Sequence, residues 1–147
     1  MKLLILSDNH RTSLREILSK RYDHVFHCGD YGMSLGELIG AHVDFVCGNC
    51  DAYGPRYKIV EVYGKKVLIL HGNQENVKYD LTRLIYKALE QEVKVCFFGH
   101  THQQECFVEQ GILFLNPGSY PEGYAEITEE EIYLYHNQIV KTIEYKW

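Results

Sequence analysis

The chain has 147 residues, a hydrophobic fraction of 46% and a formal net charge of −5 at pH 7. That is the usual size of one globular domain with its own core, so we expect a single domain over residues 1–147. An acidic chain lacks the basic surface by which proteins hold nucleic acids or anionic membranes, so neither partner is expected.

The N-terminus and the cysteines both indicate a cytoplasmic protein. The stretch MKLLILSD has a short apolar run before Ser7 and Asp8, too short for a signal peptide or a membrane-spanning helix. The chain has 5 cysteines, and this odd number does not suit a disulfide framework, so free thiols are expected.

Short apolar runs predict buried strands, and helical patterns separate several of them. In chain order, strands are expected at residues 3–6, 24–28, 43–47, 67–70, 93–98 and 112–115, and helices at 13–21, 35–40 and 76–92. The apolar face expected for the last helix consists of Val77, Leu81, Leu84, Ile85 and Leu89. After Pro121, alternating residues predict antiparallel strands with turns at 129–130 and 137–138.

This order of elements predicts a layered α/β fold with a mixed sheet, in which ligands bind beyond the carboxyl ends of the strands. Polar segments follow the apolar runs at those ends: Ser7–His10, Gly29–Asp30, Gly48–Asp51, His71–Asn73, Gly99–His102 and Asn116–Ser119. Asp, Asn and His offer oxygen and nitrogen donors for divalent ions, and glycine permits tight turns. The strand ends are therefore candidates for a metal site.

Each segment taken alone also has a structural explanation. Asp8 can cap a helix that begins near Thr12, and Asn49 and Asp51 can form an Asx-type turn. His71 can be a buried structural histidine, and histidines two residues apart can share one face of a strand. Only the combination of segments favours a metal site.

In their order, the segments resemble the motifs of the calcineurin-like metallophosphoesterases, which read DxH, GD, GN, HGx and GHxH. All of them occur between Lys2 and Ser119, and the NPGS turn resembles the small YfcE-like phosphodiesterase branch. The resemblance implies a layered sandwich of two mixed β-sheets flanked by helices. It also implies two metal ions: Asp8, His10 and His102 hold one, Asn49, His71 and His100 hold the other, and Asp30 bridges them.

Two divalent ions about 3.5 to 4 Å apart can share an activated water and bind phosphoryl oxygens. Since Asp8 and Asp30 would be the only carboxylate ligands, the filled site keeps a charge of about +2, which attracts an anionic substrate. The predicted activity is hydrolysis of small phosphodiesters by a water or hydroxide activated at a dinuclear centre, with Asp30, Asn49, Cys50 and His100 as catalytic residues. The resemblance favours Mn²⁺, and Ni²⁺, Fe²⁺ and Zn²⁺ also suit these ligands.

Three positions depart from the pattern of that family. Cys50 stands where the wider superfamily has a histidine that helps to protonate the leaving group, which predicts weak general-acid assistance. Arg11 replaces a common glycine and can either clamp a phosphate oxygen or be a solvated helix residue. Asn73 replaces a histidine of the branch and is expected to alter the pocket rim and the substrate preference.

Other functions remain open at this point. One is a non-catalytic protein-interaction module, as in the retromer subunit that shares the fold. Another is a redox or zinc site at Cys47 and Cys50, although Cys47 ends an apolar strand and no further zinc ligands stand at suitable spacing. Members of the branch are often dimers, so the resemblance allows a homodimer. Cys28 and Cys96 are expected in the core.

Overall fold

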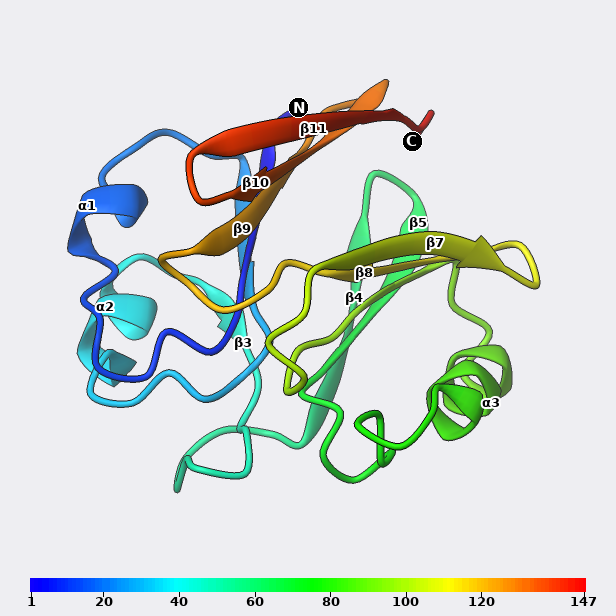
Figure 1. Cartoon of the computed structure of the whole chain (residues 1–147), viewed down its shortest axis with the longest axis horizontal. Coiled ribbons are helices and arrows are strands. Elements are labelled where there is room, and N and C mark those ends of the chain that lie inside the picture. The colour runs from blue at the N-terminus through cyan, green and yellow to red at the C-terminus, as the bar shows by residue number, and fades with distance from the viewer.

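Two β-sheets lie face to face in the structure, a computed structural model that describes residues 1–147 (Figure 1). The first sheet contains β1 (Leu3–Leu6), β2 (His24–His27), β3 (Asp44–Phe45), β9 (Gly123–Ile127), β10 (Glu131–His136) and β11 (Ile139–Glu144). The second contains β4 (Tyr57–Val62), β5 (Lys65–Leu70), β6 (Val95–Phe97), β7 (Glu105–Glu109) and β8 (Ile112–Asn116). The helices are α1 (Arg15–Leu18), α2 (Leu35–Gly40) and α3 (Thr82–Glu90).

Both sheets are mixed. Their strand orders are β11-β10-β9-β1-β2-β3 and β4-β5-β6-β8-β7. Strands β1, β2 and β3 are parallel to one another, as are β5, β6 and β8, and the remaining neighbours pair antiparallel. Helices α1 and α2 flank the first sheet and α3 flanks the second (Figure 1). The predicted sandwich of two mixed sheets between helices is confirmed.

The apolar runs of the sequence reflect strands that are buried on both faces. In β1, Leu3 and Ile5 pack into the core between the sheets, while Leu4 and Leu6 pack with residues of α1 and α2. Phe97 of β6 packs into the core between the sheets, and its neighbour Cys96 packs under α3. Successive side chains on a strand point to opposite faces, so each central strand contributes to two cores.

The parallel central strands bring the polar segments to one edge of the sandwich. The amide of Asp8 donates to the carbonyl of Gly29 (3.0 Å), and the amide of His10 donates to that of Asp30 (3.1 Å). In the second sheet, the amide of Gly99 donates to the carbonyl of His71 (3.0 Å). These bonds between adjacent loops hold the polar segments side by side.

The first helix covers only Arg15–Leu18 of the predicted residues 13–21. The last helix is also shorter than the periodicity predicts. It begins at Thr82 because residues 73–79 form turns and Asp80 accepts a hydrogen bond from the Thr82 amide (3.1 Å). Leu89, predicted on the apolar face, is 41% exposed, and Ala88 is buried instead. The other four residues predicted on the apolar face, Val77, Leu81, Leu84 and Ile85, pack in the core beneath α3 as expected.

The strands differ from the prediction in three places. The run at 43–47 contributes only β3, and β4 and β7 are not foreseen because most of their residues are exposed or half-buried.

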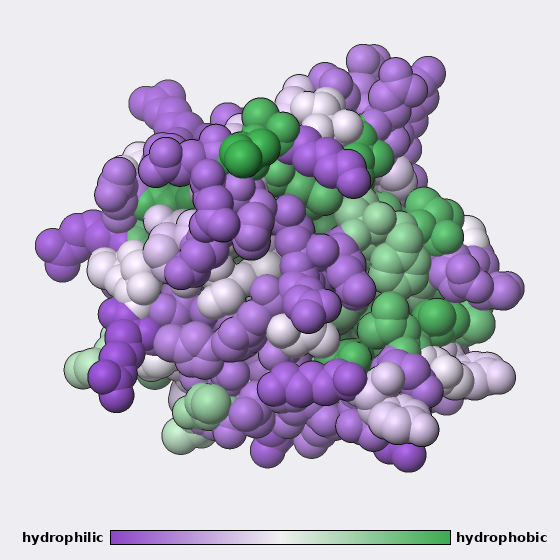
Figure 2. All heavy atoms as spheres, in the orientation of Figure 1, coloured by the Kyte–Doolittle hydropathy of each residue, from purple (hydrophilic) through white to green (hydrophobic).

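None of the helices combines the length and apolar character needed to cross a membrane. Figure 2 shows that the viewed face is mostly hydrophilic, with apolar side chains gathered over the five-stranded sheet.

Candidate functional site

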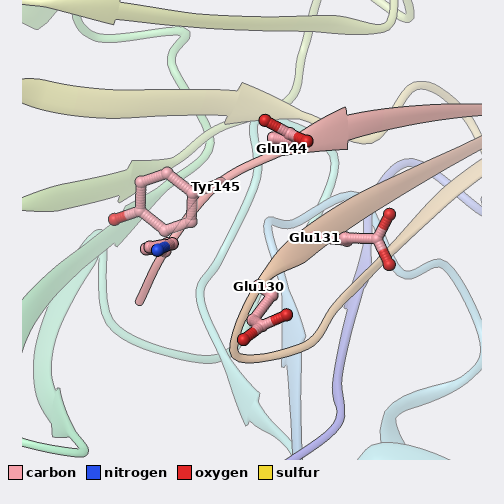
Figure 3. A pocket seen from close by; sticks show the side chains of 5 residues that line it. Glu130, Glu131, Glu144 and Tyr145 are labelled. Atoms are coloured by element: carbon pink, nitrogen blue, oxygen red, sulfur yellow. The ribbon is translucent and has the colours of Figure 1, made fainter.

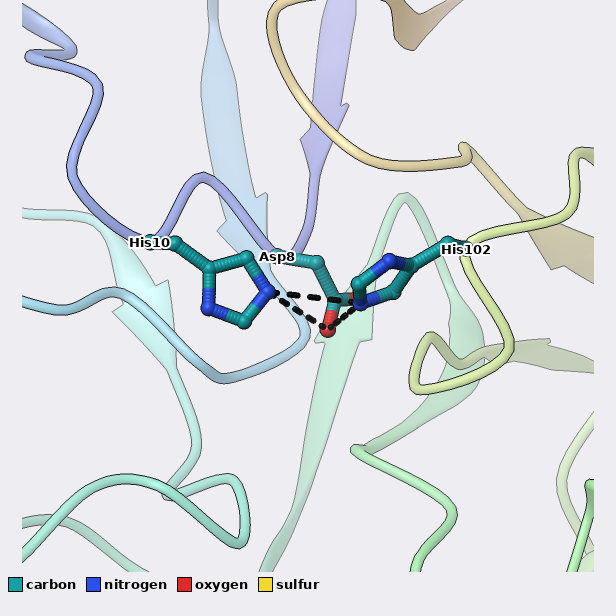
Figure 4. A group of neighbouring side chains, drawn as sticks. All are labelled: Asp8, His10 and His102. Atoms are coloured by element: carbon teal, nitrogen blue, oxygen red, sulfur yellow. Dashed lines mark hydrogen bonds and ion pairs between the residues drawn. The ribbon is translucent and has the colours of Figure 1, made fainter.

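Asp8, His10 and His102 converge at the edge where the strands end (Figure 4). The Nε2 atoms of the two histidines are 3.3 Å apart. Asp8 Oδ1 lies 3.2 Å from Nε2 of His102 and 4.0 Å from Nε2 of His10. Three potential ligand atoms thus face one another from loops that are 92 residues apart in the chain.

The two oxygens of Asp8 have different surroundings. Oδ2 accepts hydrogen bonds from the Ser7 hydroxyl (2.5 Å) and from the His100 amide (3.1 Å). Oδ1 is buried and has no hydrogen-bond partner. A buried carboxylate oxygen without a partner carries a large desolvation cost, which a bound cation would remove.

Asp8, Asp30 and His71 form a second group of potential ligands. Nε2 of His71 lies 3.2 Å from Asp30 Oδ2, 3.8 Å from Asp8 Oδ1 and 3.2 Å from Nδ1 of His100. The other ring nitrogen of His71 donates to the carbonyl of Cys28 (2.7 Å), which can only accept. That bond keeps a proton on Nδ1, so Nε2 is the ring nitrogen that can bind a metal.

Asp8 is common to both groups, whereas the resemblance assigns the bridging position to Asp30. Asp30 is held nearby through its Oδ1, which accepts the Cys50 amide (2.9 Å). The bridging role of Asp30 stays a prediction, and the geometry gives Asp8 a comparable place between the two histidine pairs.

Charge interactions within the site shift several pKa values. Burial alone would raise the pKa of Asp30, but the hydrogen bonds from His71 and from the Cys50 amide outweigh it and lower that pKa. Burial would lower the pKa of His71, yet the hydrogen bond and charge of Asp30 and the charge of Asp8 raise it. Burial and the nearby His71 lower the pKa of His100. His100 is therefore kept neutral, the form that binds metals.

Five predicted ligands have left-handed backbone conformations, which non-glycine residues seldom adopt. These residues are Asp8 (φ 51°), His10 (φ 46°), Asp30 (φ 60°), His100 (φ 70°) and His102 (φ 62°). Such conformations cost of order 1 kcal/mol each and are typical of functional sites. Five of the twelve non-glycine residues with positive φ thus lie among the predicted ligands at this edge.

Two glycines allow the loops to approach one another. A Cβ at Gly48 would lie 2.2 Å from Asp30 Oδ1, and one at Gly99 would lie 2.1 Å from the Ser7 hydroxyl and 2.7 Å from Asp8 Oδ2. These contacts are shorter than van der Waals distances, so any larger residue would displace the carboxylates.

The remaining predicted residues lie at the rim rather than inside the groups. Asn49 and Cys50 are exposed, and the Asn49 amide nitrogen faces the Cys50 sulfur (3.6 Å). Arg11 is exposed and lines a cavity of about 320 Å³ together with Asp8 and His10. Asn73 is half-buried, and its side chain makes no hydrogen bond to the site.

The structure excludes several of the structural explanations that single segments allow. Asp8 does not cap a helix, since α1 begins only at Arg15 and has no side-chain cap. His100 and His102 lie in the loop between β6 and β7 rather than on a strand. No hydrogen bond of an Asx-type turn forms at Asn49 or Asp51, since Asp51 Oδ2 accepts the amide of the preceding Gly48 (2.8 Å) and the Asn49 side chain faces the Cys50 sulfur. Such a turn forms in the NPGS segment, where Asn116 Oδ1 accepts the Gly118 amide (2.9 Å).

The cysteines do not form a redox pair. All five thiols are free, with Cys28 and Cys96 fully buried as predicted. Burial, then the charge of Asp51, raises the pKa of Cys47, while burial and the charge of Asp30 raise the pKa of Cys50. A catalytic dithiol needs the opposite shift. The free thiol at Cys50 instead belongs to the rim of the polar site.

Several supporting residues were not predicted. His27 is buried and neutral: burial lowers its pKa to about 3, and its Nε2 donates to Asn9 Oδ1 (2.7 Å). The Ser119 hydroxyl donates to the Asp8 carbonyl (2.6 Å). Asp51 accepts the amides of Asp30 (2.7 Å), Tyr31 (3.2 Å) and Gly48 (2.8 Å). Except for the bond between Asp51 and Gly48, these contacts join residues 18 or more positions apart, which the sequence does not reveal. The position of Asp51 two residues after Asn49 of the GN motif is the one local signal.

Replacement of Asp51 tests the importance of this support. Asp51→Ala leaves three amides without their acceptor, so we expect a loss of about 2 kcal/mol in the free energy of unfolding. We also expect Mn²⁺ affinity to fall about 10- to 100-fold, because the loops of Asp30 and Asn49 lose their common anchor. Urea unfolding and equilibrium dialysis measure the two effects. Asp51→Asn, which keeps one acceptor oxygen, should lie between the wild type and Asp51→Ala, and unchanged affinity in both variants would contradict the anchoring role.

A larger cavity elsewhere is chemically unsuited to a phosphate. It has a volume of about 700 Å³ and is lined by Glu130, Glu131, Glu144, Tyr145 and Lys146 (Figure 3). Three carboxylates repel an anion. The donor set at the strand ends, with two carboxylates and four imidazoles, instead fits one or two divalent cations.

Comparisons with known proteins support this assignment. Residues 1–138 match the calcineurin-like phosphoesterase superfamily domain. The probable metallophosphoesterase YsnB of Bacillus subtilis is 32% identical over 145 residues, which cover 88% of this chain and 85% of YsnB. A conserved uncharacterized Streptococcus pneumoniae protein, a predicted phosphoesterase, has a crystal structure with a TM-score of 0.82 at 25% identity, covering 98% of this chain and 97% of that one. Entamoeba histolytica Vps29 complexed with Zn²⁺ shares the fold, with a TM-score of 0.78, 23% identity and coverage of 99% and 98%.

Proposed function

The chain belongs to the calcineurin-like phosphoesterase superfamily, and from this premise we propose that it is a metal-dependent phosphodiesterase acting on small phosphodiesters. The observation that carries the proposal is the buried Asp8 Oδ1, which lacks a hydrogen bond and faces the Nε2 atoms of His102, His71 and His10. A divalent cation supplies the missing partner, and a phosphate ester is the substrate class of the superfamily.

The residues that would hold two ions are those that converge at the strand ends. They are Asp8, His10, Asp30, Asn49, His71, His100 and His102. When bound, the ions supply an activated water and positive charge for the phosphoryl oxygens. The chain itself holds the imidazoles in place: the Cys28 carbonyl orients His71, and the Ser7 hydroxyl and His100 amide orient Asp8.

Three rim residues complete the proposed site. Arg11 lines the cavity together with Asp8 and His10, and its guanidinium can donate to a non-bridging phosphate oxygen. The Cys50 thiol can give its proton to the departing ester oxygen, a task for which a thiol is a weak donor. Asn73, in the loop after His71, would contribute to substrate preference.

Hydrolysis of bis(p-nitrophenyl) phosphate with added Mn²⁺ tests the proposed function. The wild type is expected to release nitrophenolate only when a divalent ion is present, and Asp30→Ala is expected to be inactive because it removes a carboxylate from the site. Absence of both activity and bound metal with Mn²⁺, Ni²⁺, Fe²⁺ and Zn²⁺ would refute the proposal.

Cys50→His is expected to increase turnover of esters with poor leaving groups about 10-fold, since an imidazole near its ordinary pKa is a better general acid than a thiol. The Cys50 amide, which binds Asp30, is retained in this variant. Alkyl and nitrophenyl esters are compared at steady state, with Cys50→Ala as the control. An unchanged rate for alkyl esters would show that this position does not serve the leaving group.

The second candidate function is a protein-interaction module without catalysis, and the fold shared with Vps29 favours it. A surface that only binds a protein has no need for a buried carboxylate oxygen without a partner or for five strained residues around it. Metal-dependent hydrolysis therefore ranks first. The same diester assay decides between the two.

Further features of the proposal come from the sequence. Mn²⁺ is the proposed native metal, and residues 1–147 are proposed to act as one domain in the cytoplasm. The substrate is a small phosphodiester, without stable binding of nucleic acid or membrane, and the resemblance allows a homodimer. Metal analysis of protein purified without chelators, together with light scattering, tests the metal and the oligomeric state.

A further inference from the structure

A groove adjoins the metal-ligand cluster at His102. It has a volume of about 480 Å³ and lies between loop residues 102–104 and the β10–β11 hairpin. His102 both lines this groove and belongs to the group with Asp8 and His10. A phosphodiester held at the cluster can therefore extend one of its substituents into the groove.

The hairpin presents one face to the groove. In the antiparallel register, Leu134 lies opposite Lys141 and His136 lies opposite Ile139. Residues opposite one another, and residues two apart on one strand, project from the same face of a sheet. Accordingly, all four side chains line the groove.

Gln104 joins the two walls of the groove. Its Nε2 donates to the carbonyl of Tyr135 on β10 (2.8 Å) and to the carbonyl of Pro117 (3.1 Å). The half-buried amide thereby ties the loop that carries His102 to the hairpin. The distance between the walls is set by these bonds, so the groove is present before a ligand binds.

The groove offers an unpaired positive charge and an apolar surface. The lysines engaged in ion pairs are Lys2, Lys58 and Lys87, so Lys141 keeps its charge free for a ligand. Ile139 is 74% exposed, and Leu134 forms part of the floor. In a chain with a net charge of −5, a free ammonium group beside an apolar surface favours a ligand with an uncharged body and an anionic end.

We propose that the groove binds one ester substituent of the substrate, and that this substituent is an organic group of nucleoside size bearing a second anionic group. The proposal rests on the proposed phosphodiesterase function. Pockets of about 300 to 1,000 Å³ commonly enclose small organic ligands, and this groove lies within that range. Leu134 and Ile139 contact the uncharged body, and the Lys141 ammonium pairs with the second anion.

Isothermal titration calorimetry with excess Mn²⁺ compares two ligands that differ only in the second anion. These are thymidine 3′,5′-bisphosphate and thymidine 5′-monophosphate. The wild type is expected to bind the bisphosphate about 5- to 10-fold more tightly, and Lys141→Gln is expected to abolish this preference. Lys20→Gln removes the same charge from an exposed position after α1 and is expected to retain the preference.

Equal affinity of the wild type for the two ligands would overturn the proposal, and so would a preference that survives in Lys141→Gln. Hydrolysis of methyl p-nitrophenyl phosphate by the wild type is measured in parallel, because its methyl group is too small to fill the groove. Failure of the proposed function appears as no hydrolysis of this ester with any divalent ion. The calorimetric comparison decides on the groove whichever result the hydrolysis gives.

Discussion

Asp8→Asn is expected to reduce phosphodiester hydrolysis about 1,000-fold or more and to reduce Mn²⁺ binding with it. The new amide has nearly the same shape as the carboxylate. Its oxygen can keep the bonds that Oδ2 accepts from Ser7 and His100, so the fold should be retained. Its nitrogen then replaces Oδ1, and an amide NH₂ offers the three facing histidines a donor where a metal needs an anionic ligand.

Bis(p-nitrophenyl) phosphate hydrolysis and metal content after dialysis measure this effect. Glu90→Gln is the matched control, because it removes one negative charge from an exposed residue of α3 that has no ion pair. The control should retain full activity and metal content. A fully metallated and active Asp8→Asn variant would contradict the role assigned to Oδ1.

Saturating Mn²⁺ is expected to increase the free energy of unfolding by about 4 kcal/mol when the free ion exceeds its dissociation constant about 1,000-fold. The ion binds the folded chain, in which Asp8 Oδ1 is buried without a partner and Asp30 lies close by. The unfolded chain does not assemble these ligands, so the free energy of metal binding adds to the free energy of unfolding. The ion also offsets the strain of the left-handed residues around it.

Urea unfolding with Mn²⁺ or with a chelator measures this difference. The increment should largely disappear in Asp8→Asn and should remain in Glu90→Gln. An identical unfolding midpoint with metal and with chelator in the wild type would show that the converging histidines do not form a metal site of useful affinity. The result does not depend on turnover, so it tests the site even if the substrates are poor.

Much of the fold could be predicted because the burial of strands and helices requires apolar residues at regular positions in the sequence. The run Leu3–Leu6 is continuous because β1 is covered on both faces, and the alternation in Glu131–His136 reflects a strand, β10, with one interior face. Strands β4 and β7 left no clear pattern, since pairing with β5 and β8 places them as edge strands with partly exposed residues. The turns before Thr82 depend on tertiary contacts, which cannot be recognised from the helical spacing of apolar residues.

The sequence by itself determined the order of the Asp, Asn and His segments after the apolar runs, and with it the superfamily. Only the tertiary structure decided that Asp8 Oδ1 lacks a partner, that His71 presents Nε2, and that Asp51 anchors two of the loops. It also decided that Lys141 borders the same site as His102. The reason is physical: these properties depend on distances between strands that are remote in the chain, and sheet pairing sets those distances.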